Sequence, residues 1–104
     1  MYRKNPIAMN KYYDTVMGIL EQHSGYTEAE ILGGRAETCA DMRSILVALL
    51  QRKYANYEVA AMTGLSRQSV SRISAQHRDR AKHKYSLAME MREVERELSA
   101  MVDY

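Results

Sequence analysis

The sequence predicts an all-α protein of five to six helices, with a helix-turn-helix and a long C-terminal helix. Apolar residues recur at intervals of three and four along the 104-residue chain, as on one face of a helix. No segment alternates apolar and polar residues with the period of two that a strand requires. Glycines divide the chain into segments of helical length, and its single proline is Pro6. No sheet is therefore expected.

The first two helices are expected at the N-terminal end. Residues 7–23 carry apolar side chains at helical spacing, and Gly25 ends that segment. Thr27 and Glu30 form a capping box, in which each side chain can accept a hydrogen bond from the other residue's backbone amide. The box opens a short helix that is expected to stop at Gly33-Gly34.

The middle of the chain predicts the core helix. A second, weaker capping box at Thr38–Asp41 precedes Met42–Leu50, which form the most apolar helical face of the chain. We expect this central helix to end near Lys53. Asn56 is then the expected cap of a short helix that runs to Thr63.

The last forty residues contain neither glycine nor proline. Ser66 is a good N-cap for a further helix. The apolar stripe lapses between His77 and Lys84, where Asp79 is a candidate cap for a new helix. Whether residues 66–102 form one helix or two stays open at this point.

The C-terminal helix carries an apolar seam that needs a partner. Its apolar residues recur at spacings of four and three over two heptads, a pattern typical of helix pairing. The seam predicts either a homodimer or packing against residues 7–23, and both alternatives stay open. Its members are Leu87, Met91, Val94, Leu98 and Met101.

Residues 56–78 fit a helix-turn-helix. Ala60 is a small residue where two steeply crossing helices would touch, and Gly64, four positions later, suits a turn that requires a positive φ. The alternative is two ordinary helices joined at a glycine. Five apolar residues favour the motif because they lie where such a unit packs on a third helix: Val59, Met62, Leu65, Val70 and Ile73.

The net charge of +2 hides an uneven distribution. Residues 66–84 hold six basic residues against Asp79 alone, a net charge of +5. Residues 1–65 are neutral, and residues 85–104 carry a net charge of −3. The positive charge is therefore concentrated on and just after the second helix of the proposed motif, which favours double-stranded DNA as the partner.

Three stretches carry a resemblance to a known family. Glu30–Gly33, Met42–Leu50 and Tyr57–Gly64 have the order and approximate spacing of the C-terminal duplex-DNA-binding domain of DnaA, the bacterial replication initiator, whose fold is shared with Trp repressor. The resemblance covers residues 12–78. It implies docking of the second motif helix in the major groove, and a role in transcription regulation or replication initiation.

The chain departs from that family at two places. Arg35 alone stands where the family has a strongly basic loop, and Ser66–Ser69 stand where it has an Asp-His-Thr signature. The resemblance therefore implies the docking mode and not the target sequence. The chain also lacks the glycine-rich phosphate loop of an ATPase, so a stand-alone DNA-binding domain is expected over residues 1–84, followed by an amphipathic helix over residues 85–104.

The expected DNA contacts follow from this docking mode. Base edges are assigned to the exposed polar residues at the start of the second motif helix, namely Arg67, Gln68, Ser71 and Arg72. Arg43 is expected to touch phosphate or to form a surface ion pair. The full set assigned to the DNA backbone is Ser66, Ser69, Arg43, Arg35, Arg78, Arg80, Lys82 and Lys84.

The sequence also predicts what the protein lacks. No catalytic residues, metal site or cofactor are expected, because no nucleophile–base pair or ligand cluster can be drawn, and His77 and His83 lie six residues apart. Cys39 is the single cysteine, so no internal disulfide forms. Without a signal core or a long apolar run, a cytoplasmic, nucleoid-associated protein is expected. The alternative function is a helical protein-interaction module whose basic patch docks an acidic partner.

Overall fold

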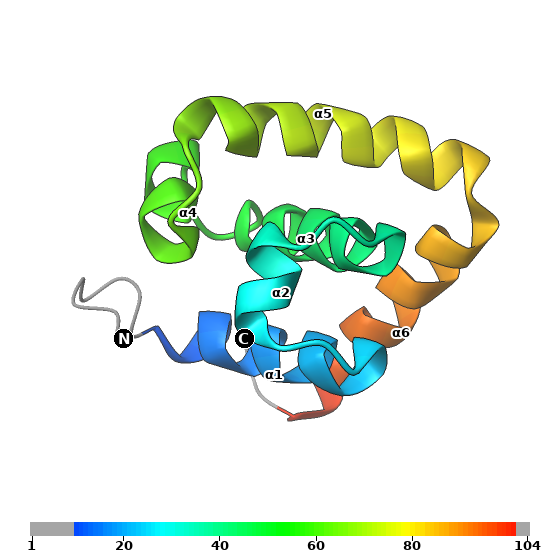
Figure 1. Ribbon diagram of the computed structural model, residues 1–104. Coiled ribbons are helices and arrows are strands. Elements are labelled where there is room, and N and C mark those ends of the chain that lie inside the picture. The colour runs from blue at the N-terminus through cyan, green and yellow to red at the C-terminus, as the bar shows by residue number, and fades with distance from the viewer. Residues whose placement is uncertain (1–9, 102–104) are drawn as a thin grey trace.

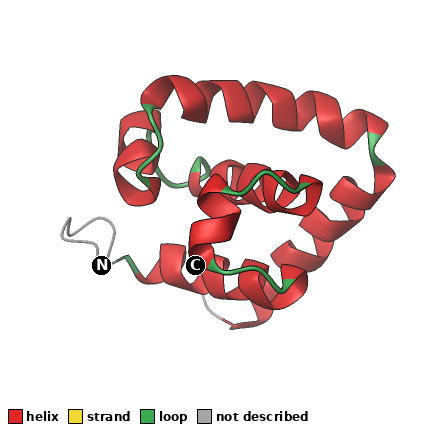
Figure 2. Ribbon diagram, in the orientation of Figure 1, coloured by secondary structure: helices red, strands yellow, loops and turns green. Residues whose placement is uncertain are grey.

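The structure of the chain is a computed structural model that describes residues 10–101. These residues form six helices and no strand, as Figure 2 shows, which confirms the predicted fold class. None of the described helices is long and apolar enough to cross a membrane. The helices are α1 (Lys11–Ser24), α2 (Glu28–Gly33), α3 (Glu37–Leu50), α4 (Asn56–Thr63), α5 (Arg67–His83) and α6 (Tyr85–Met101).

Helix α3 lies at the centre, with the other helices around it (Figure 1). It packs against α5 on one side and against α1 and α2 on the other. Four consecutive residues, Ser44–Val47, are buried. Because four consecutive helical residues point in nearly all directions, α3 is covered all round, and the predicted central helix is confirmed.

Helix α1 is shorter than the periodicity suggested. Asn10 is extended, with φ −69° and ψ 131°, and its Oδ1 accepts a hydrogen bond from the Tyr12 amide at 2.7 Å. This cap starts α1 at Lys11, so the predicted helix does not run through Asn10. The part of that prediction at residues 7–9 lies outside the described residues. Gly25 ends the helix as expected, with a φ of 78°.

The capping box at the start of α2 is confirmed. The Thr27 amide donates to Glu30 Oε1 at 2.9 Å, and the Glu30 amide donates to Thr27 Oγ1 at 3.3 Å. The chain leaves this helix at Gly34, where a Cβ would lie 2.5 Å from the Glu30 carbonyl oxygen. No side chain fits so close an approach, so this position requires glycine.

The second capping box is wrong. Helix α3 begins at Glu37, after Ala36, and Thr38 is an exposed residue of its first turn. A carboxylate is favourable in a first turn, and Glu37 also forms an ion pair with Lys84. The helix ends at Leu50, three residues before the expected end, and hydrogen-bonded turns continue to residue 54.

Helix α4 is capped differently from the prediction. Ala55 is its N-cap residue, and its amide donates to Glu58 Oε1 at 2.9 Å. Asn56, the expected cap, is already helical. Its side chain instead accepts from Gln51 Nε2 at 2.8 Å and donates to Ser71 Oγ at 3.3 Å, so it joins α4 to the preceding turn and to α5.

The turn between α4 and α5 matches the predicted helix-turn-helix. Gly64 has a φ of 78°, and Ser66 Oγ accepts from the Ser69 amide at 3.0 Å, which confirms both residues in their expected roles. Figure 1 shows α4 steeply inclined to α5 across its N-terminal end. The five apolar residues expected inside the unit are buried or packed against the core: Val59, Met62, Leu65, Val70 and Ile73.

Residues 66–101 form two helices that separate at Lys84. Helix α5 continues through Asp79 to His83, so the suggested new start at Asp79 is wrong. Lys84 is extended, with φ −126° and ψ 96°, and α6 turns back from there toward α1 (Figure 1).

The seam of α6 packs within the chain. Leu87, Val94 and Leu98 are buried in the same core as α1 and α3, and Met91 packs partly against it. Met101 is 61% exposed. Of the two predicted alternatives, the structure has the seam packed within the chain. This packing buries three of the five seam residues through which a homodimer would have to form.

Candidate nucleic-acid interface

The N-terminal end of α5 lies beside α4 and exposes its first residues to solvent (Figure 1). Ser66, Arg67 and Gln68 are exposed, whereas Val70 is fully buried against the core. The tight turn before Ser66 and the buried Val70 together fix which side of α5 faces outward. A helix N-terminus presented in this way carries unsatisfied amides and a partial positive charge, both of which attract phosphate.

Five of the residues predicted to contact DNA lie on two flanks of α5. At 3.6 residues per turn, Arg67, Ser71 and Arg78 follow one flank, and Ser69 and Arg72 follow the other. The other predicted contact residues of α5 lie between these two flanks or beyond them, and they are Gln68, Lys82 and Arg80. The four predicted base contacts therefore form an arc around the start of the helix and not a single edge.

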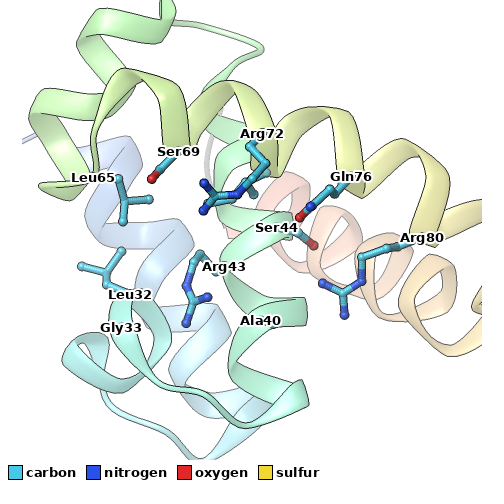
Figure 3. Close-up of a pocket in the computed structure, with 11 residues that line it drawn as sticks. Leu32, Gly33, Ala40, Arg43, Ser44, Leu65, Ser69, Arg72, Gln76 and Arg80 are labelled. Atoms are coloured by element: carbon cyan, nitrogen blue, oxygen red, sulfur yellow. The ribbon is translucent and has the colours of Figure 1, made fainter.

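The second flank borders a pocket of about 250 Å³ between α2, α3 and α5. In Figure 3, Arg72 and Arg80 extend from α5 toward α3, and Arg43 extends from α3 toward α2. Arg43 Nε donates to the Ile31 carbonyl oxygen at 2.9 Å, and its guanidinium also donates to the Gly34 carbonyl oxygen. Arg43 therefore holds the end of α2 against α3, a role that neither of its sequence-based interpretations included.

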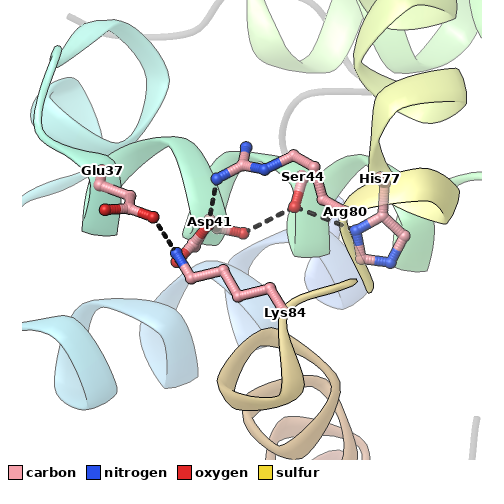
Figure 4. A network of polar contacts seen from close by, with 6 residues as sticks. All are labelled: Glu37, Asp41, Ser44, His77, Arg80 and Lys84. Atoms are coloured by element: carbon pink, nitrogen blue, oxygen red, sulfur yellow. Dashed lines mark hydrogen bonds and ion pairs between the residues drawn. The ribbon is translucent and has the colours of Figure 1, made fainter. Parts of the chain in front are cut away.

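Arg80 and Lys84 are engaged in ion pairs with α3 (Figure 4). Arg80 pairs with Asp41, and Lys84 Nζ donates to Asp41 Oδ2 at 2.7 Å and also to Glu37. Hydrogen bonds to Asp41 and Glu37 raise the pKa of Lys84, and the hydrogen bond from Lys84 lowers the pKa of Glu37. Two of the six basic residues of this segment are thus already neutralised by the fold.

His77 belongs to the same network and is half-buried. The Ser44 hydroxyl donates to the Asp41 carbonyl oxygen at 2.9 Å, which leaves its oxygen to accept from His77 Nδ1 at 3.0 Å (Figure 4). This assigns the proton to Nδ1 in the neutral ring. Burial, reinforced by the charge of Arg80 and opposed by Asp41, lowers the pKa of His77 below its usual 6.5.

Four basic side chains of α5 remain exposed and unpaired. Within residues 10–101 they take part in no ion pair and no side-chain hydrogen bond, and they are Arg67, Arg72, Arg78 and Lys82. Arg35 is exposed in the connection between α2 and α3. Asp79 lies on the same exposed side as Lys82 and is the one acidic residue of α5, so the positive surface is most uniform over the first two turns.

Sequence reasoning gave no place at this surface to Gln76 or Asn56, although both lie beside it. Gln76 lines the pocket one turn after Arg72, a spacing that could have identified it. Asn56 reaches Ser71 from α4, and nothing in the local sequence indicates that contact. Tyr57 is 60% exposed at the start of α4.

Comparison of the chain with protein-family models, with curated proteins and with solved structures finds no match. The likeness to the replication initiators and Trp repressor therefore stays a prediction. The geometry and charge of this chain's own residues are what indicate its function.

Proposed function

We propose that the chain binds double-stranded DNA by placing the start of α5 in the major groove. The observation that carries the proposal is the separation of its basic residues into two classes. Arg80 and Lys84 are paired with carboxylates of α3, whereas Arg67, Arg72, Arg78 and Lys82 are exposed and unpaired on α5. Exposed cations left unpaired on the outward side of a helix suit the phosphates and base edges of a duplex.

Each part of α5 would have its own role. Arg67 and Gln68 extend from the first turn, where arginine can recognise guanine and glutamine can recognise adenine in the major groove. Ser71 and Arg72 follow one turn later. Arg78 and Lys82 lie further along, beside Asp79, and would neutralise phosphates on the flanking backbone without reading sequence. Sequence recognition of this kind would serve transcription regulation or replication initiation, as the family resemblance implies.

The test is duplex binding measured by fluorescence anisotropy between 50 and 200 mM salt. If the four cations contact phosphate, affinity will fall with salt with a log–log slope of about −3 to −4, since each neutralised phosphate contributes about −0.9. Arg67→Ala is expected to cost about 1–3 kcal/mol and to change the sequence recovered from randomised duplexes. Lys82→Ala is expected to weaken all duplexes alike and to reduce the slope by about one.

Arg92→Ala is the matched control because Arg92 is an exposed arginine of α6, on another part of the molecule. It should bind as the wild type does. Absence of salt-dependent duplex binding, or an Arg67→Ala variant that binds like Arg92→Ala, would contradict the proposal. Indifference to DNA would favour the alternative, in which the same basic surface docks an acidic protein.

A further inference from the structure

A histidine and three carboxylates meet where α1 and α6 pack together. His23 lies in the last turn of α1, and its side chain is 13% exposed. Its Nδ1 contacts Glu90 and its Nε2 contacts Glu97, so the imidazole is held between two carboxylates of α6. The site is on a different part of the molecule from the basic surface of α5.

The third carboxylate is Glu93, one turn after Glu90. Glu90, Glu93 and Glu97 have spacings of three and four, which place them on one side of α6. One ligand atom each from His23, Glu90 and Glu93 lie within 4.8 Å of one another. Donor atoms of a tetrahedral zinc site lie about 3.5 Å apart, given bonds of about 2.0–2.2 Å. Small side-chain adjustments therefore suffice to bring the three donors onto one ion.

The three carboxylates beside His23 carry more negative charge than the neighbouring cationic side chains neutralise. In the part of the chain that the structure describes, none of the three carboxylates pairs with a lysine or an arginine. The surplus of carboxylates indicates a place suited to a cation.

We propose that His23, Glu90 and Glu93 bind a divalent transition-metal ion such as Zn²⁺, which joins the end of α1 to α6. One imidazole nitrogen and two carboxylate oxygens form a ligand set that Zn²⁺ accepts, with a fourth position for water. Glu97 is not a ligand in this arrangement. It holds the other ring nitrogen and orients the imidazole, as carboxylates behind metal-binding histidines do.

The sequence alone did not predict this site. His23 and Glu90 are 67 residues apart, so no local spacing brings the ligands together. No metal site was expected because the sequence has no cluster of ligands close to one another along the chain. Only the packing of α6 back onto α1 creates the group.

The experiment is a calorimetric titration of the full chain, without an affinity tag and stripped of metal, with Zn²⁺ at pH 7.5. We expect one Zn²⁺ per chain and a rise of about 5 °C or more in melting temperature at saturation. Mg²⁺ should bind far more weakly, since it prefers an octahedral shell of oxygens. Co²⁺ bound in place of Zn²⁺ should give the visible absorption bands of a nitrogen- and oxygen-ligated ion.

The variants separate a built site from nonspecific binding. Glu93→Gln should weaken Zn²⁺ binding at least tenfold. Because Glu93 is exposed and pairs with no side chain among residues 10–101, circular dichroism should show an unchanged structure. Glu97→Gln should weaken binding about 10–100-fold through loss of the orienting contact. Glu95→Gln, the same change on the same helix, is the matched control and should bind as the wild type does.

No Zn²⁺ binding by the wild type, or equal affinity for Glu93→Gln and Glu95→Gln, would overturn the proposal. Neither result depends on DNA binding.

Discussion

A basic residue contributes to a DNA-binding surface only if the fold has not already paired its charge. Arg80 and Lys84 look like Lys82 in the sequence, yet both reach Asp41 on α3, whereas Lys82 points into solvent. The charge of +5 in residues 66–84 therefore overstates the positive surface. Helical phase explains the difference, because Arg80 and Lys84 lie toward α3 and Lys82 lies away from it.

At the same scale, His77 makes the fold sensitive to acid. Its folded pKa is lowered below 6.5, so the unfolded chain binds the proton more readily than the folded chain does. The favourable contribution of neutral His77 is thus complete above pH 6.5 and is lost as the pH falls below 6.5 through the folded pKa. We expect the free energy of unfolding in urea to decrease from pH 7.5 to pH 5.5 more in the wild type than in His77→Asn.

His77→Asn keeps a donor for Ser44 without a titrating ring. His83→Asn is the control, because His83 is exposed on the last turn of α5, and it should retain the pH dependence of the wild type. Equal pH dependence of the wild type and His77→Asn would show that His77 does not carry the effect.

At the scale of elements, the turn between α4 and α5 determines how α5 is presented. Gly64 reverses the chain with a φ of 78°, and the Leu65 amide then donates to Thr63 Oγ1 at 3.2 Å. Leu65 packs partly against the core, and Ser66 caps α5 directly after it. Four consecutive residues thus end one helix, anchor the turn and start the next, which leaves little freedom in the direction of α5.

Gly64→Ala is expected to lower the free energy of unfolding by about 1–2 kcal/mol, the cost of a left-handed backbone for a residue with a Cβ. No atom lies within 4 Å of the Cβ position at Gly64, so the cost comes from the backbone and not from a clash. Gly33→Ala is the matched control, because its Cβ position is equally open and its φ is not positive. Chemical denaturation should show the control unchanged or slightly stabilised, and equal effects of both variants would contradict this account.

At the scale of the whole molecule, one core joins helices from both ends of the described chain. Leu87 and Val94 of α6 are buried in the same cluster as Val16 and Leu20 of α1. Contacts between α1 and α6 close the arrangement around α3. A homodimer through the seam of α6 stays a prediction, and it would require α6 to leave α1.

Leu87→Ala should therefore cost about 2–5 kcal/mol of unfolding free energy, the usual range for a leucine removed from a packed core. The cost should not change with protein concentration, because Leu87 is buried within one chain. Met101→Ala should cost less than about 0.5 kcal/mol, since Met101 is exposed. Urea denaturation at two protein concentrations tests both statements. A cost that shrinks on dilution would instead indicate that α6 is stabilised by a second copy.

Local signals in the sequence determined most of the helices, because caps and periodicity act within one or two turns. The box at Thr27, the glycines at 25 and 64 and the cap at Ser66 all function where the sequence placed them. The same reasoning failed at Thr38, because α3 starts one residue earlier at Glu37, which pairs with Lys84. It also failed at Asn56, whose side chain reaches Ser71 while Ala55 occupies the cap position. Tertiary structure alone decided which basic residues of α5 stay unpaired and which carboxylates surround His23. Those outcomes depend on side chains that lie 39 to 74 residues apart in the sequence and meet only through helix packing, which no local pattern encodes.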